Sequence, residues 1–231
     1  MASEDTKMFK VQGKRVKTWN PIGRYCEHKC DYCFVKGIVP RFSCEDCRKE
    51  VLHFHPERLA RVHKSGIVFP CDITDLMGDF IPEDWRRLVF ETMVKKAPKA
   101  TFYVLTKNPA GYRKIALEDL PNIYLGATIE TDIQEKVPSK APPVGERIAE
   151  MSLLEFPRKF LSIEPIIDFS DGFIEAIASI EPVFVYVGYD NWAHKLQEPS
   201  RAKTEALIKE LESFTEVRRK TIRKAWWETS I

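Results

Sequence analysis

The sequence predicts an α/β protein built on a parallel β-sheet, and three observations support this fold class. Six short apolar runs recur along the chain, and segments with helical periodicity separate them. Each run is apolar almost throughout, which is typical of strands that are buried on both faces. Strands that alternate with helices in this way are joined by right-handed crossovers, so we expect them to lie parallel in one sheet.

The expected strands follow in order along the chain. Residues 1–15 are polar and basic, and we expect this arm to cover a sheet edge or the bottom of the fold. The first strand is expected at residues 16–22, before a cysteine-rich loop and an irregular Cys/His-rich insertion at about 36–56. The other five strands are expected at residues 66–71, 101–106, 122–129, 159–164 and 183–189.

The expected helices lie between these strands. Proline suits the first turn of a helix, so a short helix is expected from Pro56 to His63. Beyond Pro82, apolar side chains recur at helical spacing and predict an amphipathic helix, whose apolar face carries Trp85, Leu88, Val89 and Met93. Later helices are expected up to about residue 116 and at 144–155, 172–180 and 201–214.

Composition limits the class of protein. The chain has 231 residues, 44% hydrophobic and 30% charged, which predicts a single domain over residues 1–231 with a substantial core. A net charge of +2 does not by itself indicate a nucleic-acid partner. The first residues lack the apolar core of a signal peptide, and no run approaches the ~18 apolar residues of a membrane span. We therefore predict a cytoplasmic protein without a membrane partner, whose six cysteines bind metal rather than form disulfides.

The loop after the first strand carries the strongest chemical signal. Cys26, Cys30 and Cys33 have the spacing C-x3-C-x2-C, and the aromatic Tyr32 precedes the last cysteine. Three thiolates this close in sequence can hold three irons of a [4Fe–4S] cluster and leave the fourth iron open to a small molecule. An open iron is typical of a catalytic cluster. The alternatives are a zinc knuckle and three unrelated buried thiols.

Polar side chains stand at the ends of the next five expected strands. Because parallel strands end at the same face of a barrel, these side chains predict a polar pocket there. They are Cys71 and Asp72, Thr106 and Lys107, Thr128 and Glu130, Ser162 and Glu164, and Gly188 and Asp190. Cys71 is expected to be a pocket or core thiol, and a role as hydrogen-atom donor stays open.

Several further stretches carry a resemblance to a known family. Together with the cysteine loop, they resemble the radical S-adenosylmethionine (radical SAM) superfamily, in its phage- and archaeal-type branch distantly related to spore photoproduct lyase. The resemblance covers about residues 17–190 and implies a partial (βα)6 TIM-like barrel with the cluster loop after the first strand. The stretches are Thr18–Pro21, Cys71–Asp79, Val104–Pro109, Leu125–Glu130 and Leu161–Pro165.

The resemblance also implies a reaction. Cys26, Cys30 and Cys33 would be the catalytic cluster ligands, and the open iron would chelate the amino and carboxylate groups of S-adenosylmethionine. The reduced cluster would cleave the sulfonium to a 5′-deoxyadenosyl radical, which abstracts hydrogen from a substrate. A partner such as ferredoxin or flavodoxin would supply the electron.

Cofactor-binding residues follow from the same resemblance. The adenine would lie near Tyr32 and Phe34, Glu130 or Ser162 would hold the ribose hydroxyls, and Lys107 would meet the methionine carboxylate. Glu164 belongs to the same set of strand-end residues. For each carboxylate the alternative is a structural ion pair or helix cap.

The chain departs from the pattern of the family in two places. The glycine that normally stands next to the first cysteine is shifted to Gly23, three residues before Cys26. No Gly-Gly-Glu follows the second strand, so Asp72 or Thr74 would have to contact the amino group of S-adenosylmethionine.

The insertion carries a second candidate metal site. Cys44, Cys47, His53 and His55 form the pattern C-x2-C-x5-H-x-H, and two thiolates with two imidazoles can close a tetrahedral zinc site. Archaeal members of the resembling branch share this pattern. The H-x-H spacing is tight, so the two histidines need not bind one ion. One alternative is an auxiliary iron–sulfur cluster on Cys44 and Cys47, with or without Cys71, and the other is an unmetallated loop with surface polar residues.

The tail at about 215–231 is basic and aromatic. For residues 217–222 the sequence allows either a further strand or a basic helix. The basic residues before Trp226 and Trp227 suit contacts with a phosphate backbone, and the two tryptophans suit stacking on nucleobases. Nucleic acid is therefore one possible substrate. A tail that covers the barrel is the other interpretation. The rival to an enzyme is a zinc-stabilised binding module on a degenerate barrel.

Overall fold

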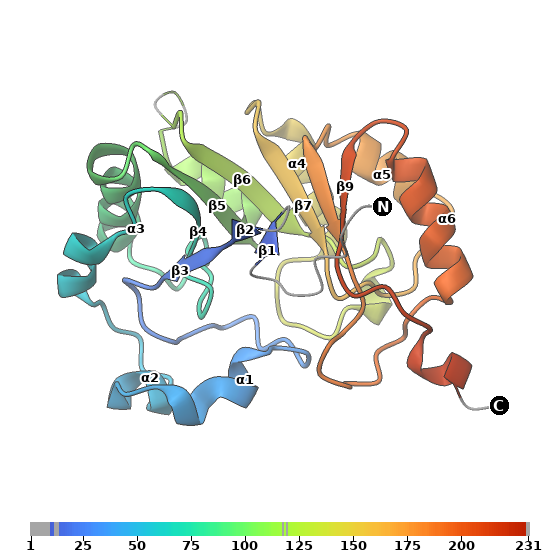
Figure 1. The fold of residues 1–231 in the computed structure, drawn as a ribbon, viewed down its shortest axis with the longest axis horizontal. Coiled ribbons are helices and arrows are strands. Elements are labelled where there is room, and N and C mark those ends of the chain that lie inside the picture. Colours follow the sequence, from blue (N-terminus) through green and yellow to red (C-terminus); the bar gives the residue numbers. More distant parts are fainter. Residues whose placement is uncertain (1–9, 12–13, 117, 119, 230–231) are drawn as a thin grey trace.

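The structure, a computed structural model, describes residues 10–11, 14–116, 118 and 120–229. Its centre is a parallel sheet in the strand order β3-β4-β5-β6-β7-β8-β9, curled into a half-barrel that alternates with helices (Figure 1). The seven strands are Lys17–Trp19 (β3), Gly66–Pro70 (β4), Ala100–Thr106 (β5), Ile123–Thr128 (β6), Lys159–Ile163 (β7), Phe184–Val187 (β8) and Glu216–Arg219 (β9).

The predicted α/β class and all six predicted strands are confirmed. The seventh strand, β9, lies in the tail that the sequence left open between strand and helix. It pairs in parallel with β8, Val185 opposite Val217, and so covers an edge that a six-stranded sheet would expose. A hairpin of β1 (Lys10–Val11) and β2 (Lys14–Arg15) forms a separate small sheet. The rest of the expected N-terminal arm lies outside the described residues.

Four longer helical segments connect the strands. Among them, α6 begins at Ser200, whose side-chain oxygen accepts a hydrogen bond from the Lys203 amide at 3.2 Å, as a helix cap does. The helix after β4 continues as a π-helix over Thr92–Lys96 (η3). The α-helical ranges are Glu83–Glu91 (α3), Val144–Leu153 (α4), Phe173–Ala178 (α5) and Arg201–Leu211 (α6).

Two expected α-helices are instead 3₁₀-helices, at Pro56–Arg61 (η2) and Pro109–Lys114 (η4). Each starts with proline as expected and spans six residues. In η4 the Tyr112 hydroxyl donates toward the carbonyls of Val104 and Gly126, which holds the turn against the sheet.

The insertion is also more regular than expected. It contains α1 (Val35–Ile38), η1 (Val39–Arg41) and α2 (Glu45–Lys49), while η5 (Gln134–Lys136) and η6 (Trp226–Thr229) lie in later connections. Among the described residues, no helix has the length and apolar character needed to cross a membrane.

The period of two in each strand divides the core. Residues such as Phe102, Val104, Leu125 and Val185 belong to the main apolar cluster between sheet and helices. The alternate positions face the inside of the half-barrel and form a second cluster of Val16, Tyr103, Phe160, Phe184 and Tyr186. The same alternation carries on to the strand ends, so it directs every second side chain there into the mouth of the half-barrel.

Candidate functional site

A cavity of about 570 Å³ lies at the carboxyl ends of the strands. This volume is within the range of about 300–1,000 Å³ that is usual for small-molecule sites. The ends of two neighbouring strands supply part of its wall, with Phe69 and Cys71 from one and Leu105, Thr106 and Lys107 from the next. The predicted polar pocket is therefore a real cavity at the predicted face.

The cysteine loop forms one side of this cavity, with Cys26, Cys30 and Cys33 all in its lining. Two backbone hydrogen bonds hold the loop to residues 138–140: Asp31 N to the Pro138 carbonyl at 3.0 Å and Lys140 N to the His28 carbonyl at 2.6 Å. Burial raises the pKa of Cys26 to about 12 and also raises the pKa of Cys30. Without a cation these thiols stay protonated, whereas a bound metal would favour their thiolates.

His28, inside the cysteine loop, was not predicted as a site residue. Its Nε2 lies 2.8 Å from Asp75 Oδ2, and both side chains are buried. Asp75 also accepts hydrogen bonds from the Thr106 hydroxyl at 2.7 Å and the Lys107 amide at 2.8 Å. Burial would raise the pKa of Asp75, but these bonds and the charge of His28 lower it. The pair fixes the loop to two strand ends and occupies the imidazole of His28.

Glu130 lies behind the cavity wall rather than in it. Its side chain is fully buried, and it accepts hydrogen bonds from Lys107 Nζ, the Tyr32 hydroxyl and, at 2.7 Å, Arg147 Nη1. Burial alone would raise the pKa of Glu130, but the charges of Lys107 and Arg147 lower it to about 2. Sequence reasoning named three members of this group and missed Arg147, which reaches the group from α4.

Asp72 lines the cavity directly. Burial raises the pKa of Asp72 to about 6, although Asn20 Nδ2 donates a hydrogen bond to it at 2.5 Å. Thr74 also lines the cavity, but its hydroxyl donates to the Tyr25 carbonyl. Of the two residues expected to contact an amino group, Asp72 therefore offers the more available oxygen.

The far side of the cavity comes from the last strands. Ser162, Glu164, Asn191 and Lys220 all line it. Burial raises the pKa of Glu164, while the charge of Lys220 acts in the opposite sense. Tyr32 and Phe34 line the side of the cysteine loop. Apart from Glu130, every predicted cluster ligand and cofactor-binding residue thus borders one cavity.

Cys71 also borders the cavity and is nearly fully buried. Burial raises the pKa of this thiol, so it is neutral at ordinary pH. Among the described residues, the group able to hold a metal ion consists of Cys44, Cys47, His53 and His55, and it leaves out Cys71 as well as Cys26, Cys30 and Cys33. This grouping does not favour the alternative of an auxiliary cluster with Cys71 as ligand.

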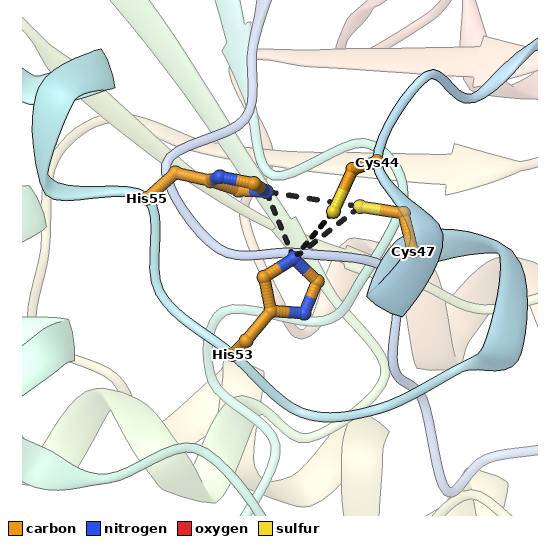
Figure 2. Close-up of side chains that lie close together, drawn as sticks. All are labelled: Cys44, Cys47, His53 and His55. Atoms are coloured by element: carbon orange, nitrogen blue, oxygen red, sulfur yellow. Dashed lines mark hydrogen bonds between the residues drawn. The ribbon is translucent and has the colours of Figure 1, made fainter.

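The Cys/His group in the insertion has converging donor atoms (Figure 2). All four ligand atoms lie within 4.8 Å of one another. His53 Nε2 is 3.3 Å from Cys44 Sγ, 3.5 Å from Cys47 Sγ and 2.9 Å from His55 Nε2. A tetrahedral zinc ion spaces such ligand atoms by about 3.3–3.8 Å, given its usual bond lengths. The tight H-x-H spacing therefore does bring both imidazoles to one point.

Both imidazoles are oriented by partners on their other nitrogen. His53 Nδ1 donates to the Val51 carbonyl at 2.7 Å, and His55 Nδ1 lies 3.3 Å from the Glu57 carboxylate. A neutral ring that donates from Nδ1 presents a lone pair at Nε2, so two lone pairs face each other here. This arrangement is the one that metal-binding histidines adopt. The group can bind a metal ion.

The basic side chains of the tail mainly contact other residues of this chain. The Arg218 guanidinium stacks 3.5 Å from the centre of the Phe184 ring, inside the half-barrel. Arg219 pairs with Glu205 at 2.9 Å, and Lys220 is almost fully buried. These contacts support the interpretation that the tail covers the barrel. A nucleic-acid substrate stays a prediction.

The two tail tryptophans dock by their indole nitrogens and leave part of each ring exposed. Trp226 Nε1 donates to the Leu196 carbonyl at 2.7 Å, and Trp227 Nε1 donates to the Glu198 carbonyl at 2.9 Å. The Glu198 carboxylate also pairs with Arg223 at 2.6 Å. The end of the tail is therefore fixed to the loop that precedes α6.

Comparison with known proteins places this chain in a family. A family model described as "Protein of unknown function (DUF5131)" matches residues 14–185, which is more than half of the chain. Searches of curated proteins and of solved structures give no match. The chain belongs to the DUF5131 family.

Proposed function

We propose that this DUF5131 protein is a radical SAM enzyme. One observation carries the proposal: three cysteines of one short loop face a single cavity at the carboxyl ends of the strands. The donor set fits a cluster with one open iron, because the imidazole within the loop, His28, is already held by Asp75. Enzymes built on barrels of this kind also carry their active sites at this face.

When bound, the cluster and S-adenosylmethionine would supply a 5′-deoxyadenosyl radical. The residues of the chain would bind and orient the cofactor. Asp72 offers a carboxylate oxygen to an amino group, and Ser162 offers a hydroxyl to a ribose. Lys107 Nζ bonds Glu130 and Tyr32, which leaves its third N–H for a carboxylate. Tyr32 and Phe34 supply apolar surface for an adenine, and a ferredoxin- or flavodoxin-type donor would supply the electron.

The test is made under argon. Wild-type protein reconstituted with iron and sulfide should bind about four irons per chain and release 5′-deoxyadenosine when S-adenosylmethionine and a strong reductant are added. Cys30→Ala should lose both. Cys71→Ala is the matched control, because it removes a thiol that borders the same cavity but lies outside the loop, and it should keep the iron. Equal iron and equal deoxyadenosine in wild type and Cys30→Ala would contradict the proposal.

We propose that the ion at Cys44, Cys47, His53 and His55 is zinc. Two thiolates and two imidazoles close a tetrahedron without leaving a position for substrate, which is typical of a structural zinc site. The same group supports the rival function, a zinc-stabilised binding module without chemistry. Elemental analysis after reconstitution separates the two, since zinc without iron supports the module and both metals together support the enzyme.

A further inference from the structure

We infer that the metal centre of the insertion anchors the cysteine loop: an ion bound by Cys44, Cys47, His53 and His55 fixes residues 21–30. The inference rests on the proposed metal ion but not on the proposed radical chemistry. The metal centre would then shape the cavity through the cysteine loop, although its four ligands do not line the cavity.

The first link is a backbone pairing. The segment that carries both histidines lies antiparallel to the stretch that leads into the cysteine loop, with Ile22 bridged to Phe54. Gly23 N donates to the His53 carbonyl at 2.9 Å, and His55 N donates to the Pro21 carbonyl at 2.7 Å. The two hydrogen bonds therefore join both metal-binding histidines to the residues just before Cys26.

The second link is a close approach. A Cβ atom added at Gly23 would lie 2.0 Å from Cε1 of His53, far inside van der Waals contact. The His53 ring thus packs directly on the backbone of residue 23. Any side chain at this position would push the ring away from the other ligands, so the loop entry and the metal centre share one packing contact.

The third link is ionic and comes from α2, the helix that carries Cys47. Arg24 donates to the Cys47 carbonyl at 3.1 Å and pairs with Glu50 at 3.2 Å. Glu50 also pairs with Lys29 at 2.8 Å, so it reaches a residue next to Cys30. Exposed ion pairs stabilise weakly by themselves, and these need a fixed helix to be useful.

A metal ion is what can fix that helix. The helix α2 has five residues, and helices this short are unstable in water without tertiary support. Its buried side chain is Cys47, a ligand. The Nε2 atoms of His53 and His55 lie 2.9 Å apart, and a cation bound by both would hold the two rings together. Without the ion, we therefore expect the insertion to loosen and to release residues 21–30.

The experiment uses full-length, iron-free protein, so its outcome does not depend on cluster assembly. Amide hydrogen exchange is measured with a chelator present and again after one equivalent of zinc. We expect zinc to slow exchange at residues 21–30 by at least about tenfold, while exchange in α6 stays unchanged. Slower exchange at 44–55 with no change at 21–30, or no zinc binding at all, would overturn the inference.

A glycine pair keeps the inference testable if removal of zinc unfolds the whole chain. Gly23→Ala should lower the zinc affinity at least tenfold in competition with a chromophoric chelator, because it displaces His53. Gly145→Ala is the matched control, since nothing lies within 4 Å of a Cβ added there, and its zinc affinity should equal that of wild type. Equal affinities for the two variants would refute the link between loop entry and metal centre.

Discussion

The two cysteine-rich regions of this protein differ in how complete their donor sets are. In the insertion, two thiols and two imidazoles converge and leave no position open. In the cavity, three thiols share one wall, and the imidazole among them is hydrogen-bonded to Asp75. A closed set can stabilise a fold, and an open set can hold a reacting molecule. If both proposals hold, ligand number and free space, rather than cysteine content, would distinguish the structural zinc site from the catalytic cluster.

The largest expected effect is loss of stability at the closed set. In zinc-loaded, cluster-free protein, Cys47→Ala should lower the free energy of unfolding by about 4 kcal/mol or more, because it removes a metal site. Cys30→Ala should cost only about 1 kcal/mol, because the thiol borders a cavity. Urea unfolding measures both. Equal losses would break the proposed division between a structural and an open site.

The next effect concerns Glu130, which is buried behind the wall of the cavity. The folded-state pKa of Glu130 is lowered to about 2, so its charge stabilises the fold above the unfolded value of about 4.5 and this contribution disappears toward pH 2. Glu130→Gln should therefore cost about 3 kcal/mol at pH 7, and the difference from wild type should shrink as the pH falls below 4.5. Urea unfolding from pH 7 to 3 measures it. A difference that does not change with pH would argue against the ionised group.

Replacing Asp72 should change the free energy of unfolding in the opposite direction to replacing Glu130. Burial raises its folded-state pKa from 3.8 to about 6, so ionisation costs the folded state free energy as the pH rises through this window. Asp72→Asn should leave stability nearly unchanged at pH 3.5 and increase it by about 3 kcal/mol at pH 8. Such a gain is typical of a residue kept for binding rather than for stability. A loss of stability at pH 8 would show that Asp72 is structural.

The smallest effect is expected at the rim of the closed set. Glu57 contacts His55 Nδ1 at 3.3 Å, and about half of its side chain is exposed. Glu57→Gln should weaken zinc binding by about tenfold, because it loosens the orientation of the ring. Glu45→Gln, which breaks an exposed pair with Lys49, should not change zinc affinity and serves as the control. Equal affinities in both variants would remove Glu57 from the metal site.

The strands and the Cys/His group of the insertion were predictable because their patterns are local. Continuous apolar runs such as Val104–Leu105 and fixed spacings such as Cys44 to Cys47 are visible in the sequence itself. The strand β9 was ambiguous, because Val217 stands among bases and only its pairing with Val185 makes it a strand. Arg218 of this strand packs on the ring of Phe184, but a basic residue gives no apolar signal in the sequence.

The rest of the site depends on distant pairings. Glu130 looked like a pocket carboxylate, but Arg147 from α4 neutralises it behind the wall. His28 and Asp75 are far apart in sequence, and only the fold brings them to 2.8 Å. One signal was available, since a histidine between two closely spaced cysteines needs a partner if it is not itself to act as a ligand.

The position of the Cys/His group in the chain has a consequence for biosynthesis. Its ligands lie between Cys44 and His55, and its contacts with residues 21–24 are also early in the chain. Lys220, on the far wall of the cavity, leaves the ribosome long afterwards. Because chains fold from the N-terminus as they are made, the insertion can capture its ion on the nascent chain, before the sheet exists. The cysteine loop would then be shaped first, and the half-barrel would fold around a preformed template.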